Sequence, residues 1–83
     1  MNVIELDVSA LEPCEPLERI LEALPRLGAG DWLRVRHRRE PRPLYGLLAE
    51  GGFRWWTRCD ERGCEIRIWR DGDAGAEQAA LDA

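Results

Sequence analysis

Residues Leu11 to Arg19 read LEPCEPLER, and this stretch decides how the rest of the chain folds. It follows a short apolar segment and opens an amphipathic one, so it predicts a turn from a strand into a helix. Pro16 suits the first position of that helix, where the missing N–H costs nothing. Cys14 therefore falls near the first helical turn, where partial positive charge and free N–H groups favour a thiolate or another anion.

The pattern on either side of this stretch predicts the element order βαβαββ. Period-two alternation predicts strands at Val3–Val8, Trp32–Arg36, Phe53–Cys59 and Cys64–Arg70. Helical spacing of apolar residues predicts one helix from Pro16 to near Leu24, and another that starts at Pro43 and ends at Gly51 or Gly52. Residues 60–63, DERG, predict a four-residue hairpin loop in which Gly63 takes a positive φ.

These elements predict an α+β fold, a two-layer sandwich in which two helices cover one face of a four-stranded sheet. A right-handed crossover places both helices on the same side of the sheet, so only that face is buried. The expected core consists of Ile4, Leu6, Val8, Leu17, Ile20, Leu21, Leu24, Leu33, Val35, Leu44, Leu47, Leu48, Phe53, Trp55, Ile66 and Ile68.

The length of 83 residues predicts one domain, which we place at residues 1–70. Residues 71–83 are rich in Gly, Ala and Asp and contain four acidic residues and no base, so we expect a disordered tail, with a frayed helix as the alternative. The net charge is −4, the sequence contains no long apolar run, and its first residues do not show the pattern expected of a leader sequence. We therefore expect a cytoplasmic protein that does not associate with membranes.

The chain contains three cysteines and one histidine, and their spacing matches no zinc site, so no metal and no cofactor is expected. No constellation typical of an enzyme is present. A disulfide framework is not expected in a reducing compartment. Cys59 and Cys64 face each other across the predicted hairpin and would pair under oxidation, but the preferred interpretation is two unpaired residues at the end of the hairpin.

The first candidate site is the rim where the loop containing Cys14 meets a basic loop. Both loops follow the carboxyl ends of parallel, neighbouring strands, which is where open sheets of this type bind ligands. Cationic neighbours would lower the pKa of the Cys14 thiol and favour a role as a sulfur carrier. A second interpretation is a phosphate or sulfonate bound by arginine, and the simplest is a packed cysteine at a helix start. The anion-binding candidates are His37, Arg38, Arg39 and Arg42.

The second candidate site is the open face of the sheet. The predicted register places Trp56 opposite Arg67 and Arg54 opposite Trp69. The face comprises Trp32, Arg34, Arg36, Arg54, Trp56, Arg58, Arg67 and Trp69. Exposed tryptophan is typical of a protein–protein contact, and a tryptophan and arginine surface is also typical of single-stranded nucleic-acid binding. A neutral body with an acidic tail argues against nucleic acid, and a third interpretation is a solvated face with Arg–Trp cation–π pairs.

Three segments carry a resemblance to a known family: LDV at residues 6–8, PCEPLERI at residues 13–20 and REPRPL at residues 39–44. They resemble the TusA (SirA-like) sulfur carriers, and more closely the uncharacterised TusA-like relatives often found with haemerythrin-type domains. The resemblance implies a sheet order of 1-2-4-3 with the fourth strand antiparallel to the others.

In the sulfur carriers the motif is Cys-Pro-x-Pro, and the cysteine carries the sulfur. When Pro16 is aligned with the second proline, Pro13 occupies the carrier position and Cys14 the first proline. The resemblance therefore favours the uncharacterised branch. We expect a non-enzymatic accessory or binding module that takes a protein partner or a small anion, with a Cys14 persulfide carrier and nucleic-acid binding as alternatives.

Overall fold

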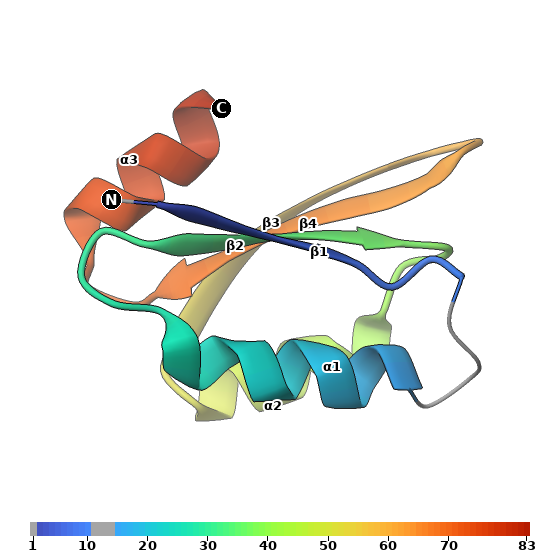
Figure 1. Cartoon of the computed structure of the whole chain (residues 1–83), viewed down its shortest axis with the longest axis horizontal. Helices are drawn as coiled ribbons and strands as arrows, with labels where there is room; N and C mark the ends of the chain where they lie inside the picture. Colours follow the sequence, from blue (N-terminus) through green and yellow to red (C-terminus); the bar gives the residue numbers. More distant parts are fainter. Residues whose placement is uncertain (1, 11–14) are drawn as a thin grey trace.

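The computed structural model describes residues 2–10 and 15–83. Its elements are β1 (Val3–Asp7), α1 (Glu15–Ala23), the short 3-10 helix η1 (Leu24–Arg26), β2 (Trp32–His37), α2 (Arg42–Glu50), β3 (Phe53–Asp60), β4 (Gly63–Arg70) and α3 (Ala74–Asp82). Helices α1 and α2 lie on one side of the sheet, and α3 lies on the other (Figure 1). The predicted α+β sandwich is confirmed, with α3 as an additional element.

The sheet has the order β1-β2-β4-β3, as the resemblance implied. Strand β1 runs parallel to β2, while β4 runs antiparallel to both β2 and β3. The predicted pairing of Trp56 with Arg67 and of Cys59 with Cys64 is confirmed. The hairpin turn is tighter than predicted, because Asp60 pairs with Gly63 and leaves only two residues between the strands.

The main core lies between the sheet and the helices α1 and α2. Most of the predicted core residues are buried or pack against the buried cluster. The prediction was wrong for Leu21 and Leu47, which are 38% and 41% exposed. A nine-residue helix turns only one narrow stripe toward a sheet, and Ile20 and Leu48 occupy that stripe.

The end of the first helical segment also buries Ala23 and Leu27, which the predicted core did not include. Pro25 ends the regular α-helix as expected, but the chain continues through η1. Arg70 at the end of β4 donates hydrogen bonds to the carbonyl oxygens of Leu27 at 3.1 Å and Leu24 at 3.4 Å. These bonds satisfy carbonyl groups that the end of a helix leaves free.

The prediction of a disordered tail was wrong, because residues 74–82 form the helix α3. Asp73 caps this helix by accepting a hydrogen bond from the Ala76 N–H at 3.0 Å. Its second carboxylate oxygen accepts from the Gly30 N–H at 2.8 Å, which ties the start of α3 to the loop before β2. Ala76 and Ala80, four residues apart on one helical face, are fully buried.

The expectation of two unpaired cysteines in the hairpin was also wrong. Cys59 and Cys64 form a disulfide with an S–S distance of 2.05 Å. Their positions directly opposite each other bring the Cα atoms to 4.0 Å, close to the spacing of non-hydrogen-bonded pairs in antiparallel sheets. The prediction failed because it argued from the expected compartment rather than from this geometry.

Candidate ligand-binding site

The structure places a pocket of about 390 Å³ at the predicted rim, where β1 and β2 end. Both strands are parallel, so their carboxyl ends open toward the same edge of the sheet. The pocket is lined by Val8, Ser9, Pro16, Leu17, His37, Arg38, Arg39, Glu40, Pro41, Pro43 and Leu44.

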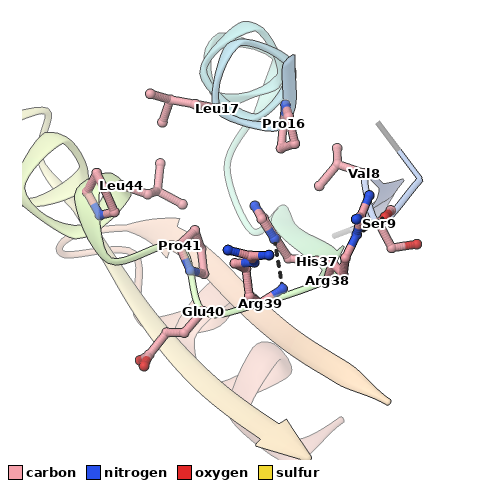
Figure 2. Close-up of a pocket in the computed structure, with 11 residues that line it drawn as sticks. Val8, Ser9, Pro16, Leu17, His37, Arg38, Arg39, Glu40, Pro41 and Leu44 are labelled. Atoms are coloured by element: carbon pink, nitrogen blue, oxygen red, sulfur yellow. Dashed lines mark hydrogen bonds between the residues drawn. The ribbon is translucent and has the colours of Figure 1, made fainter. Parts of the chain in front are cut away.

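The walls of the pocket are apolar. Pro16 and Leu17 come from the first turn of α1, and Leu44 and Pro41 come from α2 and the residue before it. Figure 2 shows these two pairs on either side of the pocket, with Val8 on a third side. The two prolines that the sequence placed at helix starts, Pro16 and Pro43, both line this cavity, because both helices begin at the same edge of the sheet.

The centre of the pocket is basic. His37 ends β2, and its imidazole Nδ1 accepts a hydrogen bond from the backbone N–H of Arg39 at 3.2 Å (Figure 2). This bond places the proton of the neutral ring on Nε2. Burial lowers the pKa of His37 below its ordinary value of 6.5, and the charges of Arg38 and Arg39 lower it further. An anion in the pocket would offset the repulsion between the two arginines and a protonated His37 ring, and it would raise the pKa of His37.

The three arginines of the basic loop are placed differently. Arg38 donates from Nε to the carbonyl oxygen of Ser9 at 3.2 Å, which ties the two loops of the rim together. Arg42 turns outward and pairs with Glu40 at 3.2 Å, so it does not line the pocket. Within residues 2–10 and 15–83, no carboxylate pairs with Arg39, whose side chain lies at the centre of Figure 2. Arg39 is therefore the cation best placed to bind a ligand.

The one carboxylate of the pocket, Glu40, is held by other groups. The Tyr45 hydroxyl donates to Glu40 Oε2 at 3.0 Å, and Arg42 binds Oε1. Because the single hydroxyl proton of Tyr45 is used, Thr57 donates to the Tyr45 oxygen at 2.8 Å. The Tyr45 ring stacks on Trp55 at a centroid distance of 5.1 Å. This network was not predicted from the sequence, and it holds both Glu40 carboxylate oxygens on Arg42 and Tyr45.

The start of α2 adds little to anion binding. Pro41 and Pro43 have no N–H group, and the Arg42 and Leu44 N–H groups donate to the carbonyl oxygens of Glu40 and Pro41 at 3.0 and 2.9 Å. The donors that would make a helix start an anion site are therefore missing or used. The basic side chains that line the pocket are those of His37, Arg38 and Arg39.

Residues 5–70 match the family described as "Uncharacterized conserved protein (DUF2249)". The chain belongs to the DUF2249 family. A search of curated proteins and a search of solved structures found no match. The matched region contains every residue that lines the pocket of this DUF2249 domain, and it ends before α3.

Cys14, the candidate sulfur carrier, lies outside the described residues of the DUF2249 domain. In the sequence it comes two positions before Pro16, which lines the pocket. In the described ranges, no three His, Cys, Asp or Glu side chains form a group that would hold a metal ion. The helices described are too short or too polar to span a membrane.

The Arg/Trp face of the DUF2249 domain is not the bare surface that the sequence predicted. Helix α3 packs against Trp32 and Trp69, which are only 5% and 4% exposed. Arg67 is also buried and donates to the carbonyl oxygens of Ala80 at 2.7 Å and Ala83 at 2.8 Å. The central residues of the proposed platform therefore hold α3 rather than an external ligand.

The remaining residues of this face form a charged border. Arg36, Arg54 and Arg58 are exposed, and Trp56 is half-buried. The predicted cation–π pairing is present, with the Arg67 guanidinium 4.5 Å from the Trp56 ring centroid. Arg34 Nε lies 3.1 Å from Glu65 Oε2, at an angle that makes the contact an ion pair rather than a hydrogen bond. A flat stacking surface for single-stranded nucleic acid is not available while α3 is docked.

Proposed function

We propose that the DUF2249 domain is a non-enzymatic binding module whose rim pocket takes a small organic anion with an apolar body. The observation that carries this proposal is the position of Arg39 beside His37, at the centre of a pocket with apolar walls. A sulfonate, phosphate or carboxylate head would accept from the guanidinium, and the apolar body would contact Leu17 and Leu44.

The size of the pocket supports a small ligand. Its volume of about 390 Å³ falls near the lower end of the range of roughly 300–1,000 Å³ found for small-molecule sites. Such sites combine apolar walls with a few convergent polar groups, which matches the arrangement here. The bound Glu40 carboxylate leaves the positive charge of Arg39 and Arg38 as the dominant field in the pocket.

The direct test is a titration with 2-naphthalenesulfonate, followed by the amide shifts of the protein. We expect Arg39→Gln to weaken binding of this anion about tenfold, because a hydrogen bond to a charged group contributes about 1.5–3 kcal/mol. Arg54→Gln is the matched control: it removes an exposed arginine on β3 that neither lines the pocket nor contacts Glu40, so the affinity should change less than about twofold.

A neutral probe separates anion recognition from apolar burial. 2-Naphthalenesulfonamide has nearly the same shape but no charge, and we expect it to bind more weakly than the sulfonate and to be insensitive to Arg39→Gln. Equal binding of the two probes, or equal losses for the Arg39 and Arg54 variants, would contradict the proposal.

Binding of the sulfonate should also depend on pH through His37. An anion favours the imidazolium and raises the pKa of His37, which the free protein holds below 6.5. By linkage, affinity for the sulfonate rises as the pH falls through the pKa of His37 in the complex, and it levels off below the pKa of the ring in the free protein, where both states carry the proton. His37 is the only histidine, so its ring protons report this pKa directly by NMR. A pKa of His37 that saturating sulfonate leaves unchanged would contradict this expectation. So would a pH dependence of the affinity that persists in His37→Asn.

The resemblance of residues 13–20 and 39–44 to TusA-like proteins supports placing the domain in that superfamily, in an accessory role. The alternative function, a sulfur carrier with a Cys14 persulfide, is supported by sequence alone. In that reaction the Cys14 thiolate would attack the outer sulfur of a persulfide donor and release the donor thiolate. Intact mass distinguishes the two functions: a carrier gains one sulfur on Cys14, whereas the binding module proposed here gains none.

A further inference from the structure

Strand β3 forms one edge of the sheet, whose order is β1-β2-β4-β3. It is eight residues long, contains no proline, and pairs with β4 without a bulge from Phe53 to Asp60. Natural edge strands are commonly protected by proline, by bulges, by short length or by a covering element. β3 has none of the first three, and α3 packs mainly against β4 and β2. The strand is therefore a template for pairing with another chain.

Every second residue of β3 points its backbone N–H and C=O groups away from β4. The Cα atoms of Cys59 and Cys64 are 4.0 Å apart, which is typical of a non-hydrogen-bonded pair, whose peptide groups point outward. The alternation of an antiparallel ladder gives Thr57 and Trp55 the same orientation. Within residues 2–10 and 15–83, no backbone hydrogen bond joins these outward groups to another element. β3 thus offers a row of donors and acceptors along its free edge.

We propose that two copies of the domain pair through β3, antiparallel and centred on Thr57, so that their two sheets become one continuous sheet. Thr57 then lies opposite Thr57 of the second copy, and Trp55 lies opposite Cys59, twice by symmetry. Each of these pairs exchanges two N–H to C=O hydrogen bonds, so all of the outward groups are used. The two-fold axis makes the dimer closed, because the same edge is used on both copies.

The side chains of β3 are complementary to one another in this register. Arg54 lies opposite Asp60 of the second copy, and Trp56 lies opposite Arg58, each pair again formed twice. The first pair joins opposite charges and the second allows a cation–π contact. The two arginine side chains are 63% and 67% exposed, and the carboxylates that they pair with in their own chain are 4.0 and 3.8 Å away. Both are therefore available to a second copy.

The other edge of the sheet does not match itself in this way. β1 has only five residues, and its full antiparallel overlap with a second β1 would place Glu5 opposite Glu5. Pairing of β1 with β3 of another copy would be head-to-tail and would give an open chain of molecules rather than a closed dimer. No residue of β3 lines the rim pocket, so this inference does not depend on the ligand proposed there.

The first test measures the mass of the full-length chain by light scattering over a concentration series. All samples carry Cys14→Ser, so no dimer forms through that cysteine. One strand pair is a small interface, so we expect the 9.5 kDa monomer at about 1 μM and twice that mass near about 1 mM. Arg54→Asp places a carboxylate opposite Asp60 at both ends of the interface and should weaken association about tenfold. Arg19→Asp makes the same charge change at an exposed position on α1 and should weaken it less than about twofold.

A mixture of two variants tests the register. Asp60→Arg alone places an arginine opposite Arg54 and should also be monomeric. An equal mixture of Arg54→Asp and Asp60→Arg restores both charge pairs and should form a heterodimer. A mixture that stays monomeric while both variants remain folded would contradict the register.

Hydrogen exchange tests the same edge without altering it, because Asp60 also accepts the Arg62 N–H at 2.8 Å and its replacement affects the hairpin turn. Exchange at the Trp55, Thr57 and Cys59 amides should slow as the concentration rises. Residues 54, 56 and 58, whose amides already face β4, should not change. The proposal is overturned if the chain stays monomeric at the highest concentration, if exchange slows at residues 3–7 instead, or if the Arg54 and Arg19 variants lose association equally.

Discussion

Arg67→Met is expected to lower the free energy of unfolding by about 3 kcal/mol, because it breaks a buried and fully engaged charge network. Arg67 donates to Glu65, to Ala80 and to Ala83, at 2.9, 2.7 and 2.8 Å. Burial raises the pKa of Glu65, but the hydrogen bond and charge of Arg67, together with Arg34, outweigh burial and hold that pKa below its ordinary value. Removing Arg67 leaves the half-buried carboxylate underpaired and the last carbonyls of α3 without a donor.

Urea denaturation followed by tryptophan fluorescence measures this loss, and Arg54→Met is the matched control. Arg54 lies on the same face, but its side chain is 63% exposed and its partner Asp71 is 4.0 Å away, so its removal should cost less than about 0.5 kcal/mol. Undocking of α3 should also shift the emission of Trp32 and Trp69 toward the red. Equal stability of the two variants would show that Arg67 does not hold α3.

Gly63→Ala is expected to cost about 2–3 kcal/mol for two separate reasons. Gly63 has a φ of +132°, which L side chains rarely adopt. A Cβ at this position would also lie 2.7 Å from the backbone oxygen of His37, so the hairpin or the rim loop would have to move. The same urea titration measures the loss.

Gly52→Ala is the control for Gly63→Ala. Gly52 has a φ of +84°, but an added Cβ meets nothing within 4 Å, so only the backbone cost of about 1–2 kcal/mol is expected. The excess cost of Gly63→Ala over Gly52→Ala reports the contact with the His37 oxygen together with the greater backbone strain at a φ of +132°. If both substitutions cost the same, the hairpin tip does not press against the rim loop.

The main layer of the fold was predictable because its pattern is strong and local. Alternation at Leu33 and Val35 and at Ile66 and Ile68 assigned the buried face of the central strands correctly. Helix α3 was not predictable from its own residues, because two alanines make a small apolar stripe. Ala76 and Ala80 form a packing surface because Trp32 and Trp69 lie opposite them, and this pairing depends on the tertiary structure.

The position of the candidate site at the rim was predictable, but the orientations of its individual side chains were not. Parallel strands followed by proline-started helices correctly indicated one rim containing His37, Arg38 and Arg39. The outward turn of Arg42 was not predictable, because it depends on where α2 begins and on its pairing with Glu40. The disulfide was missed for a different reason: the register was right, but the compartment argument was given more weight than the proximity of Cys59 and Cys64.

The most direct test of the rim pocket is an amide shift map of the unmodified protein during titration with 2-naphthalenesulfonate. The proposed site predicts saturable shifts concentrated at Val8 and Ser9, at Leu17, across residues 37–40 and at Leu44. No saturable shifts, or shifts concentrated on β3 and α3 instead, would contradict the proposal that this rim is where the domain binds its ligand.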